Sequence, residues 1–190
     1  VIVNPKPTVS ATPNDQTVCS DEAITTIDIT NPNGVAGTTF TWTRDNAVNL
    51  TGIAASGSGA SISGTLTNTT STQQTTTFTI TATSPEGCSS TTTAEVIVNP
   101  KPTVSATPND QTVCSDAAIT TIDITDPNGV AGTTFTWTRD NTTNLTGIAA
   151  SGSGTSISGT LTNATSIQQT TTFTITATSP EGCSSTTTAE

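Results

Sequence analysis

The sequence consists of two nearly identical copies of a 95-residue unit, the first starting at Val1 and the second at Val96. A long internal period is typical of repeat architectures, in which each copy forms one structural unit. Near-identical tandem copies favour a spacer or stalk over a pair of active sites, and we interpret the chain as part of a longer array. The copies differ at seven positions: Glu22/Ala117, Asn31/Asp126, Ala47/Thr142, Val48/Thr143, Ala60/Thr155, Thr69/Ala164 and Thr72/Ile167.

Apolar and polar residues alternate along most of each copy, which predicts half-buried antiparallel strands. In TTTFTITAT, Phe78 and Ile80 share one parity and threonines fill the other; Phe40 and Trp42 behave in the same way in TTFTWTR. Turns rich in Pro, Asn and Gly separate these runs. The strands expected in the first copy are 7–12, 16–19, 23–30, 38–45, 60–67, 75–83 and 89–98, with a less regular region between the fourth and the fifth.

Seven or so short strands in each copy indicate a β-sandwich. We therefore predict an all-β fold with two tandem immunoglobulin-like antiparallel sandwiches, at residues 1–98 and 99–190. The linker at residues 99–102 reads NPKP, and two prolines stiffen so short a segment, which predicts sandwiches arranged end to end. The aromatic residues at inward positions are the expected core: Phe40, Trp42, Phe78, Phe135, Trp137 and Phe173.

The last expected strand of the first copy runs through the apolar segment VIV at residues 96–98, and the same letters stand at residues 1–3. Residues 1–4 are thus expected to be the tail of a preceding repeat's last strand, and the last strand of the second copy is expected to be truncated at Glu190. We predict unpaired backbone groups beside that short strand. Residues 1–3 of a neighbouring copy could fill the gap by strand addition.

Composition excludes several functions. Four Lys plus Arg against a net charge of −10 disfavour nucleic acid and anionic membranes as partners. No apolar run approaches the roughly 18 residues of a membrane-spanning helix. The absence of His removes Ser-His-Asp and Cys-His catalysis and the commonest transition-metal ligand, so we predict that the chain is not an enzyme. Thr makes up about a quarter of the residues and suits exposed strand faces.

The four cysteines suggest disulfides, because each unit has few residues for a large core: Cys19 and Cys88 in the first copy, Cys114 and Cys183 in the second. One alternative is a bond within each repeat. It requires Cys19 and Cys88 to meet, although they lie at opposite ends of the predicted sandwich, about 20–26 Å apart, against a limit near 7 Å between Cα atoms. The second alternative joins Cys19 to Cys183 and leaves Cys88 and Cys114 for preceding and following repeats. Free thiols are the third.

The segments Thr17-Val18-Cys19, Trp42 and Glu86-Gly87-Cys88, repeated in the second copy, resemble the PKD-like, immunoglobulin-like repeats of giant bacterial cell-surface adhesins of the SprB gliding-motility type. The resemblance covers both copies. It implies a β-sandwich, an extracellular location at the bacterial surface, a role in adhesion or in spacing an adhesive tip from the cell, and no catalysis. The general PKD pattern often has Trp-Asp-Phe-Gly-Asp, whereas Trp42 is followed here by Thr-Arg-Asp-Asn.

These observations predict a structural repeat module of a long extracellular filamentous adhesin, acting as a rigid spacer with neighbouring repeats as its partners. The alternative is a carbohydrate-binding β-sandwich that engages surface polysaccharide through loops or a threonine face. No cofactor is predicted. A weak Ca²⁺ candidate is formed by Asp123, Asp126 and Asn128, whose oxygens are spaced as calcium ligands can be, while an ordinary turn is the favoured interpretation.

Overall fold

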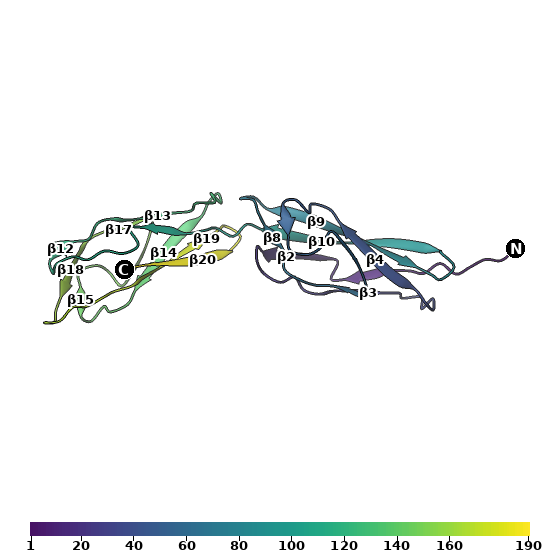
Figure 1. Cartoon of the computed structure of the whole chain (residues 1–190), viewed down its shortest axis with the longest axis horizontal. Coiled ribbons are helices and arrows are strands. Elements are labelled where there is room, and N and C mark those ends of the chain that lie inside the picture. The colour runs from purple at the N-terminus through teal and green to yellow at the C-terminus, as the bar shows by residue number, and fades with distance from the viewer. The chain divides into compact units, whose positions relative to one another are not determined.

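The computed structural model describes all residues, Val1–Glu190, and contains strands but no helix. It divides into two compact units, Val1–Pro100 and Lys101–Glu190, called here the first and second repeats (Figure 1). Each is a β-sandwich, so the predicted all-β fold with two tandem sandwiches is confirmed. No segment is a helix of the length and apolarity that a membrane crossing needs.

The first repeat contains two main sheets. One has the order β1-β3-β7, the other β2-β10-β9-β4-β6, and β5 and β8 form a separate pair. The strands are β1 (Ser10–Thr12), β2 (Asp15–Cys19), β3 (Ile27–Thr30), β4 (Thr39–Arg44), β5 (Leu50–Thr51), β6 (Ser56–Ser58), β7 (Ser61–Ile62), β8 (Thr67–Asn68), β9 (Gln74–Thr83) and β10 (Ser89–Asn99).

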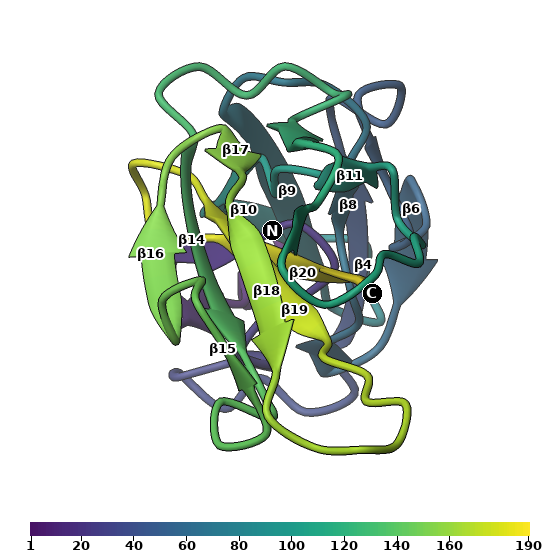
Figure 2. The same ribbon diagram turned by 90° about the vertical axis from the view of Figure 1, so that its left-hand side faces the viewer.

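The second repeat has the orders β11-β13-β17 and β16-β14-β19-β20, and a small sheet β12-β18-β15. Figure 2 shows β14, β19 and β20 running beside one another. The strands are β11 (Ser105–Thr107), β12 (Ala117–Ala118), β13 (Ile122–Thr125), β14 (Thr134–Arg139), β15 (Leu145–Thr146), β16 (Ser151–Ser153), β17 (Ser156–Ile157), β18 (Thr160–Asn163), β19 (Phe173–Thr178) and β20 (Ser184–Ala189).

The alternating residues meet between the sheets in one apolar core per repeat. Trp42 contacts Phe78 edge to face at a centroid distance of 5.7 Å, and Trp137 contacts Phe173 in the same way at 5.8 Å. Of the six predicted core aromatic residues, Phe40 is half-buried and the other five are buried. Such edge-to-face pairs add to the stability gained from apolar burial.

Gly57 explains how β6 approaches the tryptophan. It lies opposite Trp42 in the β4–β6 pairing, and a Cβ atom at this position would stand 2.4 Å from Trp42 Cζ2. No side chain fits in that space, so glycine is required for the indole ring to lie against the strand.

Three expected strands are shorter or broken, and the one expected at 7–12 is regular only in β1. The predicted strand at 60–67 appears as β7 and β8, and the predicted strand at 23–30 is regular only in β3. Gly64 lies between β7 and β8 with a φ of +138°, a conformation that interrupts a strand and that only glycine adopts readily. Ala23 keeps a single bridge to Thr65 across this break.

Candidate functional site

The end of the first repeat is built from a parallel pair of strands, which we call the joint: β2 together with residues 95–99 of β10. Glu95 pairs with Asp15, and the register runs on to Asn99 beside Cys19. On its other side, β10 pairs antiparallel with β9 as far as Val98 and Gln74. The end of β10 is therefore a central strand, with backbone partners on both edges. Val96 and Val98 are fully buried beneath it.

Polar side chains hold the last residues of β10 in place. Asn99 accepts a hydrogen bond from the Ser20 backbone N–H at 2.9 Å, and its side-chain oxygen accepts one from Gln73 at 2.7 Å. The Asn68 amide donates to the Val98 carbonyl at 3.0 Å. Because Ser20, Asn68 and Asn99 are buried, these bonds fix the point at which the chain leaves the sandwich for the linker.

The cysteines of the first repeat lie at opposite ends of β10. Cys19 ends β2 beside Asn99, whereas Cys88 immediately precedes Ser89 at the start of β10. Along a strand, ten residues span about 33 Å, far beyond the reach of a disulfide. A bond within the repeat is therefore excluded by the length of β10.

The structure gives the four cysteines two different states. Cys19 and Cys183 are each disulfide-bonded. Cys88 and Cys114 carry free thiols. Because Cys88 and Cys114 are free, a disulfide within each repeat, one of the three alternatives open from the sequence, is wrong for this chain.

The calcium candidate is engaged in hydrogen bonds of its own loop. Asp126 Oδ2 accepts from the Val130 N–H at 2.8 Å and from Thr133 Oγ1 at 3.0 Å. Asn128 Oδ1 accepts from the Thr103 N–H at 2.8 Å. Asp123 is exposed on β13, and no group of three acidic, His or Cys residues is placed to hold a metal. These contacts support the turn interpretation, and calcium binding stays a prediction.

One buried charge escaped the sequence analysis. Arg44, only 7% exposed, ends β4 and donates from its guanidinium to the carbonyls of Leu50 at 2.8 Å and Ile53 at 2.6 Å. Burial lowers the pKa of Arg44, and the nearby Asp45 charge opposes this. Arg139 repeats the arrangement with Leu145 and Ile148. The signal was present, because Arg44 has the same strand parity as the inward-facing Trp42.

The threonine face that might contact sugars covers the outer side of the larger sheet in the first repeat. Thr79 pairs with Thr43 on β4 and with Thr93 on β10, so threonines form a row across three strands. Thr43, Thr79 and Thr93 are all exposed. Hydroxyl rows of this kind are also what exposed strands ordinarily carry.

Two consecutive β-sandwiches in one chain define the class of the protein as a tandem array of β-sandwich modules. A family model described as the PKD-like domain matches residues 16–102 and again residues 111–189. The chain therefore belongs to the PKD-like domain family, with two copies in tandem. No catalytic family was identified.

Several solved structures are similar at low identity. The human desmocollin-1 ectodomain is 13% identical over 100% of this chain and 37% of its own, with a TM-score of 0.32. Mouse cadherin-23 EC22-24 is 11% identical over 97% of this chain and 65% of its own, with a TM-score of 0.38. The chain thus spans little more than a third of the desmocollin ectodomain. Likeness at this level assigns no function. The search of curated proteins found no match.

Proposed function

We propose that this chain is a structural repeat module of a long extracellular surface adhesin of bacteria, in which it acts as a stiff spacer in adhesion or gliding motility. The observation that carries the proposal is the joint. The last strand of the first repeat leads directly into a short proline linker, and the disulfide-bonded Cys19 ends the strand beside it. We infer that the partner of Cys19 is Cys183, the other disulfide-bonded cysteine of the chain, so that the bond ties this end of the repeat to its neighbour. A strand, a linker and a disulfide arranged in this way serve the extension and covalent continuity of the chain rather than catalysis or ligand turnover.

The disulfide recurs if more repeats follow the same period. Cys114 is the second-repeat equivalent of Cys19, and Cys88 is the first-repeat equivalent of Cys183. In a longer array, Cys88 would bond to the repeat before it and Cys114 to the repeat after it. Every junction would then carry both a peptide linker and a disulfide. A stable disulfide at each junction fits an oxidising, extracellular compartment.

The bond itself is tested by peptide mapping of the non-reduced chain. We expect a disulfide-linked peptide pair containing Cys19 and Cys183, with two titratable thiols per chain before reduction and four after it. Cys19→Ser should leave Cys183 as a third free thiol, whereas Cys88→Ser should leave the linked pair intact. A linked pair containing Cys19 and Cys88 would contradict the proposal.

The spacer role is tested on chains of two, four and eight repeats by electron microscopy. We expect the contour length to grow in proportion to repeat number, with little bending at the junctions. Reduction should increase the bending without unfolding the sandwiches. Compact particles whose length does not follow repeat number would refute the spacer.

The competing hypothesis is a carbohydrate-binding module that uses the threonine face. A glycan array separates the two, since the spacer proposal predicts no retained sugar. Thr79→Ala combined with Thr93→Ala is the matched control, because it removes hydroxyls from the exposed row. Binding that disappears in this variant would establish the carbohydrate-binding module instead.

A further inference from the structure

The linker between the repeats is held by hydrogen bonds at the point where it leaves the first repeat. The Asn99 carbonyl accepts from the Ser20 N–H at 2.9 Å, and the Asn99 side-chain oxygen accepts from Gln73 at 2.7 Å. Ser20 Oγ in turn accepts from the Asn68 N–H at 2.9 Å. Because Ser20, Asn68 and Asn99 are buried, the exit of the linker is fixed within the first repeat.

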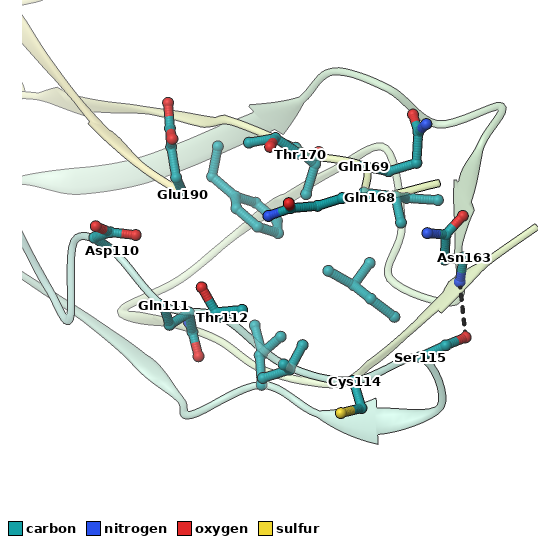
Figure 3. Close-up of a pocket in the computed structure, with 16 residues that line it drawn as sticks. Asp110, Gln111, Thr112, Cys114, Ser115, Asn163, Gln168, Gln169, Thr170 and Glu190 are labelled. Atoms are coloured by element: carbon teal, nitrogen blue, oxygen red, sulfur yellow. Dashed lines mark hydrogen bonds between the residues drawn. The ribbon is translucent and has the colours of Figure 1, made fainter. Parts of the chain in front are cut away.

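The serine that supports this exit has an equivalent in the second repeat. The Asn163 N–H donates to Ser115 Oγ at 3.0 Å, as the Asn68 N–H does to Ser20 Oγ, and Figure 3 draws the Asn163 bond as a dashed line. A bond that recurs with the 95-residue period belongs to the repeat unit rather than to one copy.

A second set of bonds holds the linker where it enters the second repeat. Asn128 lies between β13 and β14 and donates from Nδ2 to the Lys101 carbonyl at 2.9 Å, while its Oδ1 accepts from the Thr103 N–H at 2.8 Å. The Asn128 N–H donates to Thr103 Oγ1 at 3.1 Å. We call these three bonds the clamp. They bind the linker on both sides of Pro102, which is itself buried.

The clamp depends on a tight turn that the local sequence favours. Residues 126–129 read DPNG, and the Gly129 N–H donates to the Asp126 carbonyl at 3.1 Å, which closes a β-turn. Proline in the second position and glycine in the fourth suit such a turn, and Gly129 has a φ of +66°. Because the turn restricts the backbone of Asn128, little conformational entropy is lost when its side chain binds the linker.

Few backbone torsions remain free between the exit and the clamp. Only Pro100 and Lys101 contribute torsions between the bonded carbonyls of Asn99 and Lys101. The Pro100 ring fixes its own φ at about −65°, and Pro102 restricts the ψ of the preceding Lys101 to extended values. The ψ of Pro100 and the φ of Lys101 are therefore the torsions through which the junction can bend.

The second repeat holds its entry segment with one more acceptor than the first repeat does. In the first repeat, Asn33 makes the same three bonds to residues 6–8. In the second, Asp126 Oδ1 also accepts from the Thr103 N–H, at 3.1 Å. Its equivalent Asn31 has a side-chain oxygen without a hydrogen-bond partner. The additional acceptor thus stands in the copy whose entry segment connects the two sandwiches.

We propose that Asn128 is a positioning residue of the junction: by clamping residues 101–103 to the second repeat, it confines bending to Pro100 and Lys101 and so sets the stiffness of the spacer. This inference rests on the proposed spacer function, but the two can fail separately. The contour length of longer chains tests the spacer, whereas the experiment below follows a single junction. Breaking the clamp should leave both sandwiches folded and increase the motion of one repeat against the other.

The free thiols offer one labelling site in each repeat. Spin labels on Cys88 and Cys114 report the distance between the repeats by pulsed electron paramagnetic resonance. The chain carries Cys19→Ser and Cys183→Ser, so that no other cysteine is labelled and no disulfide restrains the junction. We expect a narrow distribution of label distances in this chain, because the clamp and the prolines restrict the linker.

Asn128→Ala should widen that distribution, because it removes the side-chain bonds to Lys101 and Thr103. Asn33→Ala is the matched control. It removes the same side-chain bonds in the first repeat, where residues 6–8 do not connect the two sandwiches, and it should leave the distribution as narrow as before.

Amide hydrogen exchange shows whether each variant has broken its bonds. The Thr8 amide should exchange about tenfold faster in Asn33→Ala. The Thr103 amide keeps Asp126 as an acceptor and should therefore gain less in Asn128→Ala.

A second pair of variants decides the matter if Asn128→Ala unfolds the second repeat, which Trp137 fluorescence would show. Thr103→Val removes the hydroxyl that accepts from the Asn128 N–H, and Thr8→Val is its control in the first repeat. Thr103→Val should widen the label distances and Thr8→Val should not. The proposal is overturned if the folded second-repeat variants leave the width unchanged, or if the first-repeat controls widen it equally.

Discussion

The two repeats differ at seven of 95 positions, yet their cores are closed to different degrees. In the first repeat, Leu50 and Leu66 are completely buried under the end of β10. The equivalent Leu145 and Leu161 line a pocket of the second repeat and retain some exposure. None of the seven substitutions lies in β10 or β20. The end of β10, residues 96–99, thus covers the core of the first repeat.

The last strand of the first repeat, β10, is therefore part of the core of that repeat. Burying two valine side chains fully contributes about 1.5–3 kcal/mol each, a large part of the stability of a small domain. We expect the first repeat to unfold at higher urea than the second. Each repeat contains one tryptophan, so Trp137→Phe makes fluorescence report on the first repeat and Trp42→Phe on the second. The stability of each variant is measured in the single-tryptophan chain that reports on its repeat.

The largest effect is expected from the aromatic pair at the centre of each core. Phe78→Ala and Phe173→Ala each remove a buried ring that contacts the reporting tryptophan edge to face. The cavity left should lower the free energy of unfolding of that repeat by about 3–5 kcal/mol. Urea titration of both variants measures this. An unchanged free energy of unfolding in Phe173→Ala would contradict the equivalence of the two cores, because the second repeat would then lack a packed core.

A smaller effect is expected from the buried arginine. Arg44→Met keeps the length of the side chain but leaves the Leu50 and Ile53 carbonyls without their donor. The expected loss is about 2–3 kcal/mol in the first repeat. Arg139→Met should cost the same in the second, because its hydrogen bonds match within 0.1 Å. Unequal losses would contradict this equivalence of the two arginines.

Val98→Ala tests directly whether the end of β10 stabilises the first repeat, because it removes buried methyl groups from the joint. We expect a loss of about 1.5–2.5 kcal/mol from the first repeat, moving its urea midpoint toward that of the second. Val48→Ala is the control, because this exposed valine contributes no core packing. If the midpoint of the first repeat does not move, the end of β10 is not part of its core.

The smallest effect is expected from a natural difference between the copies. In the first repeat the Asn31 side-chain oxygen is buried without a hydrogen-bond partner, whereas its equivalent Asp126 accepts from Val130 and Thr133. Asn31→Asp should gain about 0.5–1 kcal/mol, and Asp126→Asn should lose a similar amount. Thermal unfolding of the two variants measures both shifts. Shifts of the same sign would refute this account of the difference.

Much of the fold could be predicted from alternation and turn residues. Phe78, Ile80 and Trp42 face inward as their parity requires. These features depend on local pattern and on the period, which a sequence shows directly.

The remainder depends on contacts that only the folded chain creates. Arg44 is buried because five hydrogen bonds to nearby backbone carbonyls replace its hydration. Parity alone could not outweigh the cost of burying a charge. The sequence likewise left a Cys19–Cys88 bond open. The parallel register of β2 and β10 excludes it, because it places the two cysteines at opposite ends of β10. Gly64, which divides an expected strand, gave no sign of its backbone angle.

The proposed Cys19–Cys183 bond would also change how the chain responds to a pulling force. A force applied at the two termini passes through the sulfur atoms and bypasses every residue between them. Residues 20–182 lie within the bypassed stretch, so their unfolding would not lengthen the tether while the bond is intact. The strands β1, β2 and β20 lie outside that stretch and stay in the path of the force. Under tension the chain would then lengthen only through its two end segments, and a reductant that opens the bond would make the whole chain extensible.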